Sequence, residues 1–178
     1  MSEIRIPNID VTTLSKKLRK DLRSDHAGET GAVMIYKGIL AVSRDPALRS
    51  FASTHLETEQ KHLALFDSWL PKEDKSRLLL LWRVSGYLLG AFAAFISNRF
   101  TYHTIEIVEQ FVVEHYESQI LTAPGDLGEI LLKLQAEEKE HQLEAITLQD
   151  DSQRQVRKLW GLIVDAGSRL AVNVARLI

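Results

Sequence analysis

Two pairs of residues with the same spacing limit the folds that this chain can adopt. Glu59 and His62 stand three residues apart, and so do Glu138 and His141. On an α-helix, side chains three residues apart point to the same side, so each pair can share one bound ion. The second pair follows the first by 79 residues. The chain therefore repeats one arrangement, which indicates two similar helices in one fold.

An isolated glutamate precedes each pair at a similar distance. Glu29 lies 30 residues before the first pair, and Glu109 lies 29 residues before the second. Taken singly, each glutamate is as well explained by a solvated helix surface. Together, four Glu and two His on four helices are the ligand set of ferritin-like carboxylate bundles. The sequence predicts a two-metal site with these ligands: Glu29, Glu59, His62, Glu109, Glu138 and His141.

The remaining sequence favours helices throughout. Nine Gly and four Pro interrupt 178 residues, and strand-like alternation is absent. Asp45 and Pro46 are typical of a helix start, and Pro124 begins a turn. We expect one all-α domain over residues 1–178, a ferritin-like four-helix bundle with two additional amphipathic or apolar helices. The predicted helices cover residues 12–42, 46–69, 78–97, 100–122, 127–148 and 153–178.

The composition excludes several kinds of site and partner. There is no cysteine, which excludes disulfides, thiolate metal sites and a cysteine nucleophile. Carboxylate and imidazole ligands suit iron or manganese. A net charge of −2 and the lack of a nucleic-acid-binding motif argue against nucleic acid as a partner. Residues 1–10 show no signal or transit pattern, so we expect a cytoplasmic chain.

Two of the expected helices carry more apolar surface than a bundle core needs. Residues 78–96 are almost all apolar, but Arg83 interrupts them, and the stretch that follows is shorter than the roughly 20 residues that span a bilayer. Residues 153–178 place a polar stripe opposite a row of leucines. We expect residues 78–97 to lie in the membrane interface as a peripheral contact. The last helix either joins this contact or packs on the bundle.

Other polar residues near the expected ligands have more than one explanation. Asp25 and His26, one turn before the first ligand, either orient a ligand or cap a helix. We expect His55 to be an ordinary surface or core histidine. His103 and Glu106 reverse the order of the repeated pairs, and we interpret them as structural.

The motifs around the expected ligands resemble one known family. Residues 25–29 read DHAGE and are followed by Gly31 and Ala32, which resembles a signature of the demethoxyubiquinone hydroxylases of ubiquinone biosynthesis. The resemblance covers about residues 18–178. It is carried by segments 59–63, 86–90, 108–119, 137–141 and 166–169.

This resemblance implies a membrane-associated di-iron monooxygenase that hydroxylates the ring of a polyprenylated, demethoxyubiquinone-type substrate. It implies two iron ions held by the six residues above, NADH as electron donor, and His115 and Tyr116 as catalytic residues near the quinone and its reduction. It also implies a peripheral position on the cytoplasmic face of the cell membrane, or on the matrix side of the mitochondrial inner membrane in a processed eukaryotic chain. Ser24 and Thr30 stand where the family usually has an apolar residue and a tyrosine, so the ring position stays open.

Two alternatives to this enzyme stay open at this stage. A ferritin-like iron-oxidising protein would share the metal site but needs a soluble surface for cage assembly. A non-catalytic lipid-binding scaffold of a quinone-biosynthesis complex would be favoured by loss of a ligand, and no ligand is lost. The sequence does not decide the tail length of the substrate, or whether the chain forms a homo-oligomer or joins a complex.

Overall fold

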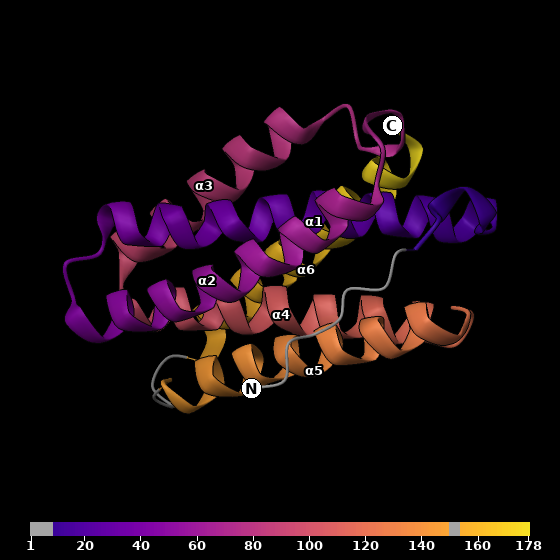
Figure 1. The fold of residues 1–178 in the computed structure, drawn as a ribbon. Coiled ribbons are helices and arrows are strands. Elements are labelled where there is room, and N and C mark those ends of the chain that lie inside the picture. The colour runs from indigo at the N-terminus through magenta and orange to yellow at the C-terminus, as the bar shows by residue number, and fades with distance from the viewer. Residues whose placement is uncertain (1–8, 150–153) are drawn as a thin grey trace.

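The fold is a bundle of long helices, drawn in Figure 1 from a computed structural model that describes residues 9–149 and 154–178. All regular structure in these residues is helical, which confirms the all-α prediction. Two short 3-10 helices, η1 (Val11–Thr13) and η2 (Lys72–Asp74), accompany the α-helices. The α-helices are α1 (Lys16–Val42), α2 (Pro46–Trp69), α3 (Leu79–Ile96), α4 (Asn98–Ile120), α5 (Gly125–Thr147) and α6 (Arg154–Leu177).

Four of these helices, α1, α2, α4 and α5, form the bundle (Figure 1). Helix α3 packs along α1 on the outside of the bundle, and α6 packs against α1 and α4. The two helices predicted to be additions to the four-helix core therefore both lie on α1.

Side-chain caps set where the helices begin. Asp45 accepts a hydrogen bond from a backbone N–H in the first turn of α2, as the sequence predicts. The predicted start of the first helix was wrong, because Ser15 Oγ accepts from the N–H of Leu18 and α1 begins at Lys16. The predicted start of the last helix, Gln153, lies outside the described residues.

The apolar core consists of two clusters, one toward each end of the bundle, and each of the four bundle helices contributes to both. One cluster includes Ile35, Ile39, Leu48, Phe51, Ile105, Val108 and Ala145. The other includes Leu22, Phe66, Trp69, Tyr116, Leu127, Leu131 and Leu134. The predicted metal ligands lie between these clusters along each helix, so apolar packing at both ends fixes the positions of polar groups in the middle.

Helix α3 touches α1 through glycines. A Cβ on Gly86 would lie 2.4 Å from the carbonyl oxygen of Gly31, and one on Gly90 would lie 2.0 Å from that of Ile35. The two backbones are therefore in direct contact. The opposite face of α3 is exposed and apolar, and among the described helices α3 alone is long and apolar enough to cross a membrane. The large apolar side chains exposed on α3 are Leu80, Leu81, Val84, Tyr87, Leu88, Phe92, Phe95 and Ile96, with Arg83 and Ser85 exposed among them.

Candidate metal centre

The six predicted ligands meet in the middle of the bundle. Each of the four bundle helices contributes at least one, and every one is at most 4% exposed. They are Glu29 on α1, Glu59 and His62 on α2, Glu109 on α4, and Glu138 and His141 on α5.

Their nitrogen and oxygen atoms form two overlapping groups, and within each group the ligand atoms lie within 4.8 Å of one another. The first group is Glu29, Glu59, His62 and Glu138, and the second is Glu59, Glu109, Glu138 and His141. Glu59 and Glu138 belong to both groups, so their carboxylates are placed to contact two ions at once. Each group adds one histidine and one further glutamate, which is the arrangement of a carboxylate-bridged two-metal site.

The contacts and chemistry of the buried donor atoms indicate whether metal ions fit between these six residues. Five buried ligand atoms make no regular hydrogen bond in the described structure and instead meet one another in three ion pairs of 2.9, 3.1 and 3.2 Å. Buried charged groups are costly unless they are paired or bind a metal. Oxygen and imidazole donors of this kind suit divalent iron or manganese, so the donor set fits such a pair. The five atoms are Glu59 Oε1, His62 Nδ1, Oε1 and Oε2 of Glu138, and His141 Nδ1.

Burial and neighbouring charges shift the pKa values of the residues in the cluster. Burial, and then the charge of Glu138, raise the pKa of Glu59 and of Glu109 well above the usual range. Burial also acts to raise the pKa of Glu138, but the adjacent imidazoles of His141 and His62 outweigh it and lower that pKa to about 2. Burial acts to lower the pKa of both histidines, yet their carboxylate neighbours raise it. Four carboxylates and two imidazoles thus share one buried space, and bound cations would balance the excess of acidic groups.

Carboxylates and a second histidine surround the two ligand imidazoles. Nε2 of His62 lies 2.7 Å from Glu137 Oε2, which leaves Nδ1 of His62 toward the ligand cluster. A metal-binding histidine commonly donates its other N–H to a carboxylate in this way. The ring of His55 lies 4.1 Å from that of His141, and His55 Nε2 lies 3.0 Å from Glu144 Oε2. His55 was expected at the surface or in the core; it is 4% exposed, and its ring lies against that of a predicted ligand.

Two tyrosines donate hydrogen bonds to the isolated glutamates, and each tyrosine bonds to the glutamate on the other helix. The hydroxyl of Tyr116 on α4 donates to Glu29 Oε1 on α1 at 2.5 Å, and that of Tyr36 on α1 donates to Glu109 Oε1 on α4 at 2.8 Å. The sequence singled out Tyr116 but missed Tyr36. The signal was present, because each tyrosine follows the glutamate of its own helix by seven residues.

The polar residues before Glu29 do not contact the ligands in the predicted way. Asp25 Oδ1 lies 2.9 Å from His115 Nε2 and accepts from Gln119 Nε2 at 2.7 Å. His26 Nε2 lies 2.9 Å from Asp67 Oδ1. Both residues lie inside α1, so neither caps it. Among the sequence candidates, His115 therefore lies beside the centre with a buried carboxylate as its partner.

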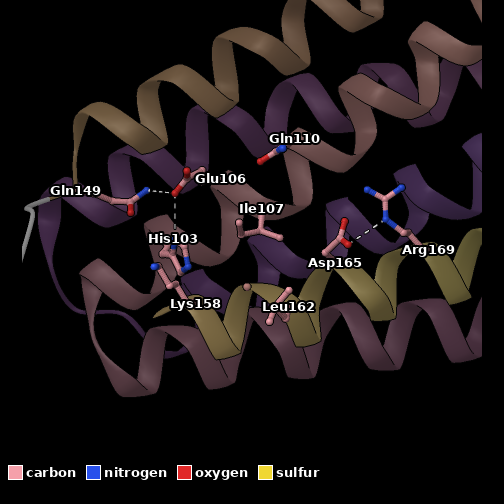
Figure 2. A pocket seen from close by; sticks show the side chains of 10 residues that line it. His103, Glu106, Ile107, Gln110, Gln149, Lys158, Leu162, Asp165 and Arg169 are labelled. Carbon is pink, nitrogen blue, oxygen red and sulfur yellow. Dashed lines mark hydrogen bonds and ion pairs between the residues drawn. The ribbon is translucent and has the colours of Figure 1, made fainter. Parts of the chain in front are cut away.

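A cleft of about 500 Å³ lies between α4 and α6, away from these residues (Figure 2). His103 and Glu106, which we interpreted as structural, form an ion pair in it, with Nδ1 and Oε2 3.0 Å apart. Lys158, Asp165 and Arg169 line it from α6. None of the six predicted ligands lines this cleft, so it is separate from the candidate metal centre.

The family described as ubiquinone biosynthesis protein COQ7 matches residues 16–175, almost the whole chain. This chain belongs to that family. The match confirms the family predicted from the motifs around Glu29.

Individual relatives carry related names. A 3-demethoxyubiquinol 3-hydroxylase of Rhodospirillum rubrum is 38% identical over 101 residues, covering 55% of this chain and 48% of that protein. A human mitochondrial protein named NADPH-dependent 3-demethoxyubiquinone 3-hydroxylase is 28% identical over 162 residues, covering 86% of this chain and 75% of the human one. A Dictyostelium discoideum protein of the same name is 30% identical over 136 residues, covering 70% of this chain and 61% of its own length.

These matches differ in how much of each relative they include. The chain spans about half the length of the Rhodospirillum rubrum protein and three quarters of the human one. The human and Dictyostelium names specify NADPH and mitochondria, whereas the motifs led us to expect NADH and, for a bacterial chain, the cytoplasmic membrane face.

Proposed function

We propose that this protein is an O2-dependent di-iron monooxygenase of ubiquinone biosynthesis, which hydroxylates the ring of a polyprenylated demethoxyubiquinone-type substrate. The observation that carries the proposal is the pair of overlapping ligand groups that share Glu59 and Glu138. The family match and the names of the relatives support the choice of substrate.

In this proposal, the residues of the centre bind the metal pair, hold its ligands in place and exclude water. When bound, a pair of iron ions supplies the reductive activation of O2. Glu59 and Glu138 would hold both ions, and the remaining four ligands would hold one ion each. Tyr36 would hold Glu109 in place, and Tyr116 would hold Glu29, through hydrogen bonds from their hydroxyl groups. The apolar clusters at both ends of the bundle keep bulk water from the centre.

We further propose that α3 rests in the membrane interface and that α6 assists it. Leu80 and Phe95 of α3 are 74% and 77% exposed. Several leucines of α6 are exposed to a similar degree. Exposed apolar surface of this extent is typical of a protein or membrane contact. Because one face of α3 packs on α1, the helix lies along the interface in this proposal and does not cross the bilayer. A substrate with a long apolar tail would reach the enzyme from the same layer.

The two alternatives share part of this structure. A ferritin-like iron-oxidising protein would use the same ligands, but the apolar face of α3 disfavours a soluble cage. A non-catalytic scaffold would not need six buried carboxylate and imidazole side chains that converge in two overlapping groups. We propose a reduced pyridine nucleotide as the electron source, and a homo-oligomer or a quinone-biosynthesis complex as the assembly.

The deciding experiment supplies 18O2 to a strain that lacks its own ring hydroxylase and expresses this chain. The reaction consumes O2, two electrons and two protons and converts one ring C–H to C–OH, with water as the second product. We expect one 18O atom in the new hydroxyl group by mass spectrometry. The variant Glu109→Ala should keep the fold and give no product. No label in the product of a strain with iron-loaded wild-type protein would contradict the proposal.

A further inference from the structure

Beside the metal centre, a buried carboxylate holds one histidine ring in place. Asp25 Oδ1 lies 2.9 Å from Nε2 of His115, and the side chains of these residues are 0% and 9% exposed. Gln119 donates to the same carboxylate oxygen at 2.7 Å. Ser24 Oγ lies 3.2 Å from the same nitrogen of His115. The pair thus runs from a fully buried acid to a ring that reaches the protein surface.

The surrounding hydrogen bonds determine which nitrogen of His115 carries the hydrogen. Ser24 donates its hydroxyl hydrogen to the carbonyl oxygen of Asp21 at 2.6 Å, so its oxygen is free to accept. The carboxylate of Asp25 is also an acceptor. With acceptors on both sides, Nε2 must be the donor, and the lone pair of the neutral ring stays on Nδ1. Phe111 stacks on the ring with 5.8 Å between centroids and 14° between planes, which fixes its orientation.

The position of Asp25 is costly to the fold. Its Oδ2 and the Oε1 of Gln119 are buried without a hydrogen-bond partner in the described structure. Among described residues, the salt-bridge partner of Asp25 is His115, whereas Asp21, one turn earlier, pairs with Lys17 and Arg176. Burial raises the pKa of Asp25, and the contact with His115 opposes that rise. Such an arrangement is typical of a site where a carboxylate orients a functional histidine.

We infer that Asp25, aided by Ser24, is a positioning residue that fixes His115 with its hydrogen on Nε2 and presents Nδ1 to the substrate. In the step that we assign, an O–H bond of a quinol-type ring breaks and its proton forms an N–H bond at Nδ1. The electron pair stays on the substrate oxygen, and the Asp25 carboxylate balances the resulting imidazolium charge. The proton then leaves to solvent, which the 9% exposed side chain of His115 reaches. The inference rests on the proposed function for the identity of the substrate.

Two measurements on the full-length protein test this inference. The first is 15N–1H NMR of the histidine rings in protein loaded with diamagnetic Zn²⁺, with the His115 signals assigned through His115→Gln. We expect hydrogen on Nε2 in the wild type and in Asp25→Asn, which keeps an acceptor. In Asp25→Ala we expect a mixture of the two tautomers. Hydrogen on Nδ1 in the wild type would overturn the inference.

The second measurement is steady-state hydroxylation by iron-loaded protein of a short-tailed demethoxyubiquinol. Loss of a positioned proton acceptor costs about 100–10,000-fold, so we expect kcat to fall about 100-fold in Asp25→Ala and about tenfold in Asp25→Asn. KM and iron content should stay near the wild-type values, because neither variant changes a ligand. Ser24→Ala should lower kcat a few-fold in the same direction, and it decides the case if the Asp25 variants fail to fold.

Asp21→Asn is the matched control, because it alters a buried carboxylate one turn away on the same helix. We expect it to lower the melting temperature while kcat and the His115 signals stay unchanged. Unchanged kcat in Asp25→Asn and Ser24→Ala would overturn the inference. If the wild-type protein itself does not hydroxylate the quinol, the proposed function fails, and the NMR result alone still decides how His115 is held.

Discussion

The middle of the bundle and the outer face of α3 reverse the usual distribution of polarity in a water-soluble protein. At the centre, four carboxylates and two imidazoles are at most 4% exposed, whereas Leu80 and Phe95 on α3 are 74% and 77% exposed. Both arrangements are unfavourable for an isolated chain in water. A metal pair would remove the cost at the centre, and a lipid layer would remove it on α3. In our proposal the two regions bind different partners, so a substitution that damages one should leave the other intact.

The largest expected effect is loss of metal from the centre. Glu138→Ala removes a carboxylate that belongs to both ligand groups, and we expect iron to fall from about two ions per chain to less than half an ion. Glu140→Ala, an exposed residue two positions away on α5, is the control and should keep all its iron. Iron is measured by elemental analysis after anaerobic reconstitution, with circular dichroism to check the fold. Normal iron content in Glu138→Ala would show that the shared carboxylate is not a ligand.

The second prediction concerns membrane binding by the exposed face of α3. Replacing Leu80, Leu88 and Phe95 by Ser should weaken binding to phosphatidylcholine–phosphatidylglycerol vesicles at least 100-fold, because burying each side chain contributes about 1.5–3 kcal/mol. The iron content should not change. Co-sedimentation measures the binding, and Leu132→Ser/Leu143→Ser on α5 is the control, since those leucines are also exposed. Equal loss of binding in both variants would mean that α3 has no special role.

The residues of the candidate metal centre and of the exposed face of α3 were easier to predict from the sequence than the contacts between helices. The six buried candidate ligands could be predicted because a Glu and a His recur at helical spacing and an isolated glutamate precedes each pair. The exposed face of α3 could be predicted because its apolar residues are contiguous. The helix starts were less predictable, since Ser15 competes with earlier residues as a cap. Glu137, which contacts His62 from another helix, could not be found, because 75 residues separate the two in the chain.

The partners of Asp25 were missed for the same physical reason. His115 lies 90 residues along the chain, and only the packing of α4 on α1 brings it to the carboxylate. Tyr36 was a different kind of omission, because its spacing from Glu29 repeats that of Tyr116 from Glu109. Local spacing therefore predicted which side chains share a face, but contacts between helices needed the folded chain.

The third prediction concerns the contact that joins the two regions. Gly90→Ala places a Cβ against the carbonyl oxygen of Ile35 on α1, and such overpacking costs about 1–3 kcal/mol of unfolding free energy. Gly167→Ala on α6 is the control, because nothing lies within 4 Å of its Cβ, and it should be neutral or slightly stabilising. Urea denaturation measures both variants. If Gly90→Ala is as stable as Gly167→Ala, α3 is not held to α1 by backbone contact.

The smallest expected effect separates the two halves of the centre itself. Tyr36→Phe and Tyr116→Phe each remove one hydroxyl that donates to a glutamate ligand, and burial and the neighbouring glutamates raise the pKa of both phenols well above 10, so both are neutral donors in the wild type. Each loss should lower iron affinity about tenfold, or about 1.4 kcal/mol, since a hydrogen bond to a charged group contributes that order of energy.

At saturating iron the two variants should differ in turnover. Tyr116 also adjoins His115, with 6.4 Å between ring centroids, whereas Tyr36 packs on Phe51 and His55. We therefore expect Tyr116→Phe to slow turnover a few-fold more than Tyr36→Phe. Chelator competition measures the affinity and O2 consumption measures the turnover. Equal turnover in the two variants would show that the two tyrosines only hold the glutamates, and that the His115 side of the centre has no separate part in the reaction.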